Sequence, residues 1–161
     1  SQGTIGVVLK ISSSVEYATR LMVCLARRRG QPPASAEALS ESENVPADYV
    51  NQILLRLKRA GLVESHRGSA GGYGLAREPS SITLDQVFSA VEGPVFEDVC
   101  AKFDGGARDC RHQGRCGISP VWAKLGSLID QYLNSVTLAS LLAEPTPGAS
   151  VVEAARTSRS L

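Results

Sequence analysis

The stretch from Val45 to Gly61 constrains the fold more than any other part of the chain. Its apolar residues recur at the three- and four-residue spacing that forms one face of a helix: Tyr49, Val50, Ile53, Leu54 and Leu57. Pro46 suits the first helical position, where its missing N–H group costs nothing, and Gly61 suits the C-terminal cap. We therefore expect an amphipathic helix whose apolar face packs against the rest of the domain.

A shorter helix precedes this one across a tight turn. Ser35 is a good N-cap for a helix through Leu39, and Asn44 tolerates the left-handed conformation that a tight turn requires. Two short helices around such a turn form a helix-turn-helix. Residues 62–67 then have the pattern of a strand, 68–72 of a turn and 73–75 of a returning strand, which predicts a β-hairpin wing.

The other periodic segments are also helical. A serine cap at residues 12–14 opens a helix that ends at the cationic residues 27–29, and a capping box at 83–86 opens another that ends at Gly93. Ser119 and Pro120 start a long C-terminal helix whose apolar face is wide enough to bury against a second chain, and Thr137 caps a last short turn.

These segments predict a fold that is mainly α with a small β wing, a winged helix-turn-helix followed by a long C-terminal dimerisation helix. Residues 1–9 are expected to be a leader or disordered, 10–93 the DNA-binding domain, 94–118 an aperiodic loop, 119–143 the dimerisation helix and 144–161 a disordered tail.

Bulk composition says little about partners, because 17 basic and 16 acidic residues leave a net charge of +1. No apolar run approaches the roughly 20 residues of a membrane span, and no signal peptide is recognisable, so we expect a cytoplasmic protein with no membrane partner. Its four cysteines are then expected to stay reduced. Cys24 lies in an apolar helical stretch and is interpreted as a small buried hydrophobe.

A recognition helix presents its N-terminal residues to base edges in the major groove. Asp48, Asn51, Gln52 and Leu55 are short enough for that position, and amide side chains suit adenine. Cationic residues at the end of the helix suit phosphates, and Arg67 leads into a wing slim enough for a minor groove. The predicted DNA-binding residues are Asp48, Tyr49, Asn51, Gln52, Arg56, Lys58, Arg67, Gly71 and Gly72, with Arg59 as a further phosphate contact.

A purely structural interpretation competes with this one, because helix-turn-helix geometry also occurs in proteins that never bind DNA. Gly71 and Gly72 equally suit a tight turn with no functional role. An enzyme is not expected, since the chain has neither a CxxC pair nor a cofactor-binding glycine motif after a strand.

Three cysteines fall in the aperiodic loop. Cys100, Cys110 and Cys116 are separated by nine and five residues, with glycines between them. Three soft ligands select zinc, copper(I) or an iron–sulfur cluster, and His112 is the obvious local candidate for a fourth ligand. Spacing alone leaves structural zinc, an iron–sulfur cluster and unligated redox thiols open.

The chain resembles the Rrf2 family of bacterial transcriptional regulators, and within it the iron–sulfur sensors of the IscR and NsrR kind. The resemblance runs from about Leu9 to Leu142, and its most specific piece is the wing sequence from Arg67 to Tyr73. It implies a homodimer built on the C-terminal helix, two winged domains on double-stranded DNA at a palindromic operator, and an iron–sulfur cluster near the dimer interface. It further implies that Cys100, Cys110 and Cys116 ligate iron.

The fourth ligand differs between branches of that family. The IscR branch has a histidine three residues after its last cysteine, where this chain has Ser119, and its first cysteine spacing is shorter. In another branch an acidic residue early in the first helix reaches the cluster across the dimer, and Glu16 occupies that place. The resemblance therefore favours Glu16, with His112 as the competitor and an ordinary solvated first-turn carboxylate as the alternative.

Together these features predict a DNA-binding regulator, most simply a repressor, whose operator affinity depends on a [2Fe–2S] or [4Fe–4S] cluster responding to redox state, nitric oxide or iron–sulfur supply. The alternative is a winged-helix repressor without a cluster, which uses its cysteines as a thiol switch or a structural zinc site.

Overall fold

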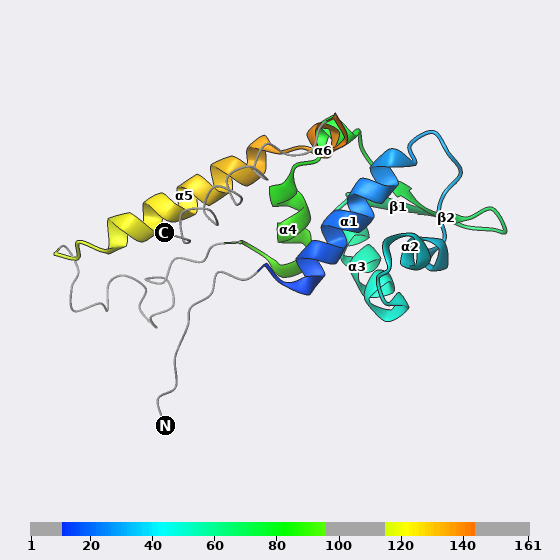
Figure 1. Cartoon of the computed structure of the whole chain (residues 1–161), viewed down its shortest axis with the longest axis horizontal. Coiled ribbons are helices and arrows are strands. Elements are labelled where there is room, and N and C mark those ends of the chain that lie inside the picture. Colours follow the sequence, from blue (N-terminus) through cyan, green and yellow to red (C-terminus); the bar gives the residue numbers. More distant parts are fainter. Residues whose placement is uncertain (1–10, 96–114, 144–161) are drawn as a thin grey trace, which may run out of the picture.

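A computed structural model describes residues 11–95 and 115–143 (Figure 1). In chain order the elements are α1 (Ser13–Arg27), α2 (Ala36–Glu43), α3 (Ala47–Arg59), β1 (Val63–His66), β2 (Gly72–Leu75), the 3-10 turn η1 (Pro79–Ser81), α4 (Leu84–Glu92), α5 (Ser119–Ser135) and α6 (Leu138–Ala143). The predicted leader, the predicted tail, Cys100, Cys110 and His112 lie outside the described residues. The mainly helical fold with a two-stranded wing is confirmed.

Local capping starts the helices where the sequence predicts. The Ser12 hydroxyl accepts from the Val15 N–H at 3.2 Å, and that of Ser35 accepts from Ala38 at 3.1 Å. Thr83 and Gln86 form the reciprocal capping box that begins α4. Because each cap satisfies backbone donors that the first helical turn leaves free, these serines and threonines determine the helix starts.

The turn between α2 and α3 also has the predicted conformation, with Asn44 left-handed at φ 51°. The Ser40 hydroxyl donates to the Val45 carbonyl at 2.7 Å and so closes the turn from within. One detail of the prediction is wrong: Pro46 is the N-cap and α3 begins at Ala47. Proline fits there, because its extended backbone leads into the helix and no N–H group is required, although it supplies no side-chain cap.

The hairpin is shorter on its first strand and longer on its second than the sequence predicts. Val63 pairs with Leu75 and His66 pairs with Gly72. The unpredicted feature is a bridge from Ala34 to Tyr73, whose N–H groups and carbonyls exchange hydrogen bonds of 3.0 and 2.8 Å. A Cβ atom on Gly72 would lie 2.5 Å from the Ala34 carbonyl oxygen, so this bridge requires glycine.

The core lies among α1, α3 and α4, which Figure 1 shows packed together beside the hairpin. Its completely buried side chains include Leu21, Met22, Leu54, Leu57 and Val87. Among the described residues, α5 and α6 contribute Leu133 and Leu138 to the core, and Ile129 and Leu141 pack against it. In Figure 1 most of α5 therefore extends outward from the winged-helix body.

Backbone hydrogen bonds anchor the C-terminal end of α5. Thr83 bridges to Thr137, the Leu84 N–H donates to Val136 at 2.9 Å, and the Leu138 N–H donates to Ile82 at 3.0 Å. The chain after α5 is thereby joined to the segment that enters α4. Across residues 11–95 and 115–143, no helix has the length and apolar character needed to span a membrane.

Candidate DNA-binding surface and cysteine segment

Helix α3 separates its apolar and polar residues onto opposite faces. Val50, Ile53, Leu54 and Leu57 are buried, and the predicted base-edge residues Asp48, Asn51, Gln52 and Leu55 are all exposed. Asn51 donates to its own helix at the Ala47 carbonyl, 3.2 Å away. Within the described residues Asp48 and Gln52 make no side-chain hydrogen bond, so both carry groups available to a partner.

Three other residues predicted to contact DNA already make contacts within the chain. The ring of Tyr49 packs edge-on against Tyr17 of α1, with centroids 5.8 Å apart. The Arg56 guanidinium donates to the Val91 carbonyl of α4 at 2.7 Å. The ammonium group of Lys58 donates to the Ser65 hydroxyl on the wing. These contacts fix α3 against three neighbours.

Arg56 therefore differs from Arg59, the other arginine of α3. Its guanidinium satisfies a carbonyl in the last turn of α4, which has no intrahelical N–H partner. Arg59 is exposed and makes no side-chain hydrogen bond to the described residues. Long-range packing of this kind leaves no trace in the local pattern, so sequence reasoning did not separate the two arginines.

The wing carries its cation at an exposed tip, where Figure 1 shows the hairpin projecting beyond the helices. Arg67 is exposed there, and the turn is closed by a hydrogen bond of 3.0 Å from the Gly71 N–H to the Gly68 carbonyl. A Cβ atom on Gly71 would lie 2.3 Å from the His66 carbonyl oxygen. Backbone geometry thus accounts for Gly71 and Gly72, and their predicted DNA contacts stay predictions.

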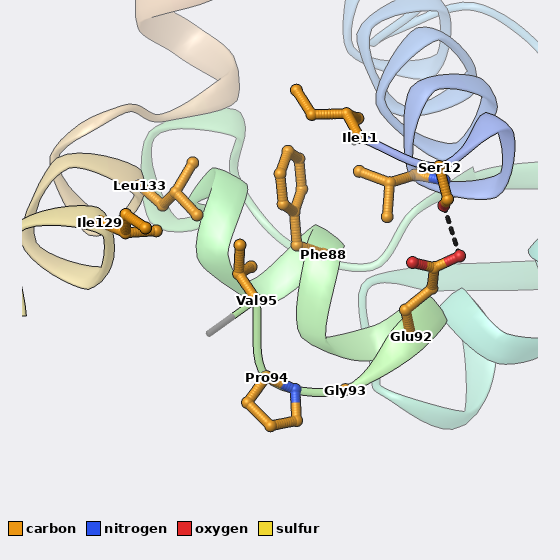
Figure 2. Close-up of a pocket in the computed structure, with 10 residues that line it drawn as sticks. Ile11, Ser12, Phe88, Glu92, Gly93, Pro94, Val95, Ile129 and Leu133 are labelled. Atoms are coloured by element: carbon orange, nitrogen blue, oxygen red, sulfur yellow. Dashed lines mark hydrogen bonds between the residues drawn. The ribbon is translucent and has the colours of Figure 1, made fainter. Parts of the chain in front are cut away.

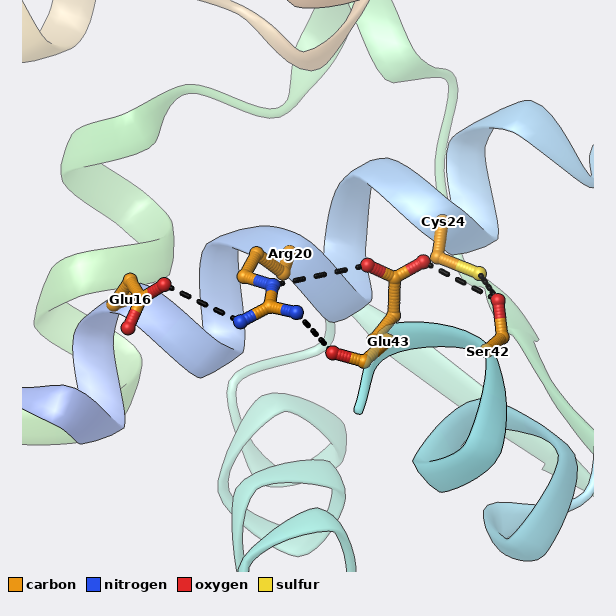
Figure 3. Close-up of polar contacts among 5 residues, drawn as sticks. All are labelled: Glu16, Arg20, Cys24, Ser42 and Glu43. Carbon is orange, nitrogen blue, oxygen red and sulfur yellow. Dashed lines mark hydrogen bonds and ion pairs between the residues drawn. The ribbon is translucent and has the colours of Figure 1, made fainter. Parts of the chain in front are cut away.

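A chain of polar contacts connects Glu16 to the helix-turn-helix (Figure 3). Arg20 pairs with the Glu16 carboxylate at 3.4 Å and with the Glu43 carboxylate at 3.8 Å, and it also donates to the Glu43 backbone carbonyl. Glu43 is the last residue of α2, directly before the turn into α3. Glu16 is the more exposed carboxylate, with 57% of its side chain accessible against 20% for Glu43.

The same region confirms the interpretation of Cys24. Cys24 is 6% exposed, and its thiol lies 3.7 Å from the Ser42 hydroxyl. Burial raises the pKa of this thiol above its usual value. A protonated, buried thiol is neither a ready nucleophile nor a ready metal ligand, so Cys24 belongs to the core.

Of the predicted cluster ligands, Cys116 and Glu16 are described. Cys116 is a free, half-buried thiol three residues before α5 begins. The part of the chain that the structure describes holds no group of three or more histidine, cysteine, aspartate or glutamate residues able to share a metal. Figure 1 shows the start of α5 far from α1, so the structure does not bring these two residues together within one chain.

Helix α5 carries an apolar stripe that is exposed in the single chain. Its members repeat at helical spacing and are between 38% and 58% exposed: Val121, Leu125, Leu128 and Tyr132. On another face of the helix, Ile129 and Leu133 line a cavity of about 260 Å³ with Phe88 and Val95 (Figure 2). At its rim the Ser12 hydroxyl donates to the Glu92 carboxylate.

Comparison with known proteins identifies relatives over most of the chain. The Rrf2 family model, described as an iron-dependent transcriptional regulator, matches residues 11–144, which span every described helix and strand. The HTH-type transcriptional regulator IscR of Vibrio parahaemolyticus is 33% identical over 136 residues, covering 84% of this chain and 79% of that protein.

Two solved structures are similar at comparable identity. IscR of T. potens has a TM-score of 0.67 at 33% identity and covers 87% of this chain and 89% of its own. CymR, the global cysteine regulator of B. subtilis, has a TM-score of 0.66 at 30% identity and covers 83% of this chain and 96% of its own.

Proposed function

The chain belongs to the Rrf2 family of transcriptional regulators, and from that premise we propose that it is a homodimeric repressor whose affinity for a palindromic operator depends on an iron–sulfur cluster. Like its relatives it is a DNA-binding regulator and not an enzyme. The proposal adds the dimer, the cluster and its ligands.

The recognition surface is the polar face of α3 together with Arg67 on the wing. Asp48, Asn51 and Gln52 are exposed at the N-terminal half of α3, which is the part of a recognition helix that meets base edges. Their side chains project from a helix held on α1, α4 and the wing by Tyr49, Arg56 and Lys58. In this arrangement Arg67 and Arg59 supply phosphate or minor-groove contacts.

The apolar stripe on α5 supports the dimer. Side chains such as Leu128 and Tyr132 remain about half exposed in a single chain, and burying such a stripe against a second copy removes it from water. A twofold dimer through α5 places two α3 helices at the same distance from the symmetry axis. It therefore matches an operator with two symmetric half-sites, which for helix-turn-helix dimers lie about 34 Å or a multiple of it apart.

Cys100, Cys110 and Cys116 are the proposed cluster ligands, with Glu16 as the fourth. Thiolates are the usual ligands of iron–sulfur clusters, and Cys116 is a free thiol. When bound, such a cluster supplies a centre that oxidants or nitric oxide alter. In one chain, α1, which carries Glu16, lies far from the start of α5, which follows Cys116 (Figure 1). For this reason we assign Glu16 to the cluster of the partner chain. A site that includes both Glu16 and Cys116 then joins two chains.

Arg20 supplies the connection from this site to DNA binding. It holds Glu16 on one side and the last residue of α2 on the other (Figure 3). When Glu16 binds the cluster, its carboxylate leaves Arg20, which then pairs with Glu43 alone. When the cluster is lost, Glu16 competes with Glu43 for the same guanidinium. The turn that leads into α3 thus experiences different contacts in the two states.

Anaerobic purification tests the cluster. We expect a coloured protein with iron and acid-labile sulfide, and gel-shift assays on the promoter of its own gene that differ between cluster-bound and apo forms. Cys116→Ala should lose iron, whereas Cys24→Ala, at the buried cysteine, should retain it. For the fourth ligand, Glu16→Gln is compared with Glu37→Gln, an exposed acid in the first turn of α2.

The alternative is a regulator without a cluster that responds through its own thiols, and the structural similarity to CymR, the global cysteine regulator of B. subtilis, is the reason to test it. A colourless protein that holds one zinc per chain, or none, contradicts the iron–sulfur proposal and leaves DNA binding intact. His112 replaces Glu16 as the fourth ligand if Glu16→Gln keeps its iron and its spectrum unchanged.

A further inference from the structure

We propose that Leu55 reads the C5-methyl group of a thymine in the major groove, an inference that rests on the DNA-binding function proposed above. It adds to the polar contacts a side chain whose chemistry selects one base. It also predicts the composition of the half-site that the protein binds.

Leu55 lies in the middle of the outward face of α3 and is 50% exposed. Three and four residues before it come Gln52 and Asn51, and three and four after it come Lys58 and Arg59. Because residues at these spacings are neighbours on a helix surface, an apolar side chain is placed between amide groups and cations. Its half-exposed surface is available to a partner of this face.

The other large exposed hydrophobic residues of the described chain lie elsewhere or have cover. Tyr49 on the same helix packs against Tyr17. Those outside α3 are on α5 or directly before it, beside the cavity in Figure 2, or at the end of α6: Ile11, Val95, Ile118, Val121, Leu125, Leu128, Tyr132 and Leu142. Leu55 is therefore a separate apolar element within a polar recognition face.

Thymine is the base partner that fits such an element. In the major groove the base edges present hydrogen-bond donors and acceptors, and the thymine methyl is the one apolar group among the four standard bases. A leucine placed over a polar edge removes water without offering a hydrogen bond, which costs affinity. A leucine over the methyl group buries apolar surface from both partners.

Helix geometry adds a spacing to this preference. Leu55 lies about 5 Å along the helix axis from Asn51 and Gln52, which is between one and two base-pair steps. If an amide reads adenine, as its donor and acceptor suit, the thymine read by Leu55 lies one or two base pairs away. Each half-site should therefore contain neighbouring adenine and thymine positions.

The test replaces thymine by deoxyuridine, which keeps the pairing edge and lacks only the methyl group. The full chain first selects its duplex from a random-sequence pool, and each thymine in the selected half-site is then replaced in turn. At one or two positions per half-site we expect an approximately fourfold loss of affinity for the wild-type protein, the effect of burying one methyl group. On the unmodified duplex, Leu55→Ala should bind about as weakly as the wild-type protein binds the deoxyuridine duplex. Replacing thymine by deoxyuridine should not weaken its binding further.

Two further variants separate this role from a general loss of affinity. Leu55→Met keeps an apolar side chain and should keep the response to deoxyuridine, whereas Leu142→Ala, an exposed leucine on α6, should change neither affinity nor response. A thymine methyl effect that persists unchanged in Leu55→Ala, or no methyl effect at any position, overturns the proposal while DNA binding stands. Failure to enrich any duplex overturns the proposed recognition surface itself, and the inference with it.

Discussion

Helices α3 and α5 are both amphipathic, yet they use their apolar residues in opposite ways. Helix α3 buries Val50, Leu54 and Leu57 completely inside its own chain and turns polar residues outward. Helix α5 buries little beyond Leu133 and exposes a stripe that includes Leu128. The core is thus completed within one chain, with Leu133 and Leu138 included, whereas α5 leaves an apolar stripe exposed that the proposed dimer would bury.

The largest loss of stability should come from a substitution on the buried face of α3. Leu54→Ala removes a fully buried side chain and should lower the free energy of unfolding by about 3 kcal/mol, through lost burial and the cavity left behind. Leu128→Ala removes the same atoms from an exposed position and should change the stability of the isolated chain by under about 0.5 kcal/mol. Denaturant unfolding under monomeric conditions measures both, and equal losses would contradict the comparison.

The next effect concerns the self-association of α5. Leu128→Glu should weaken the dimer by about 3 kcal/mol, roughly a hundredfold, because symmetry buries the unpaired charge twice. Operator binding should weaken with it. Sedimentation equilibrium gives the dissociation constant, with Leu142→Glu on α6 as the matched control. Undiminished dimerisation of Leu128→Glu would show that α5 does not form the interface.

A smaller loss of stability should come from a substitution in the wing, which, like α3, is stabilised by contacts within its own chain. Gly72→Ala places a Cβ atom 2.5 Å from the Ala34 carbonyl oxygen and should cost about 2 kcal/mol. Gly74→Ala, two residues along the same strand, meets no atom within 4 Å and should be nearly neutral. Thermal unfolding compares the two variants. Equal melting temperatures would contradict the close approach of Gly72 to the Ala34 carbonyl.

The smallest effect separates two arginines on α3. Arg56→Ala should lower stability by about 1 kcal/mol, because the Val91 carbonyl loses its donor. Arg59→Ala should leave stability unchanged and reduce the salt dependence of operator binding by one phosphate contact. Urea unfolding and affinity measured against salt concentration distinguish them. If Arg56→Ala also changes the salt slope, its guanidinium leaves α4 to contact DNA.

Features that depend on neighbouring residues were predictable from the sequence. The N-caps at Ser12 and Ser35, the box at Thr83 and the left-handed Asn44 each follow from groups within a few residues. The outward face of α3 followed from the same periodicity.

Contacts between distant segments were not predictable. The Ala34 bridge to the wing and the bond from Arg56 to Val91 join parts of the chain that no local pattern relates. For the same reason, the sequence proposed Arg56 and Lys58 for DNA without indicating that they also hold α3 in place.

The backbone anchor between Thr83 and Thr137 has a mechanical consequence. It fixes one end of α5 to the body, and the 17 residues of that helix make a lever about 25 Å long whose free end lies beside Cys116. By simple trigonometry, a tilt of about 5° at the anchor displaces the free end by about 2 Å. If the free ends are instead held together in a dimer, the same tilt moves each winged-helix body. Small angular changes then change the distance between the two α3 helices.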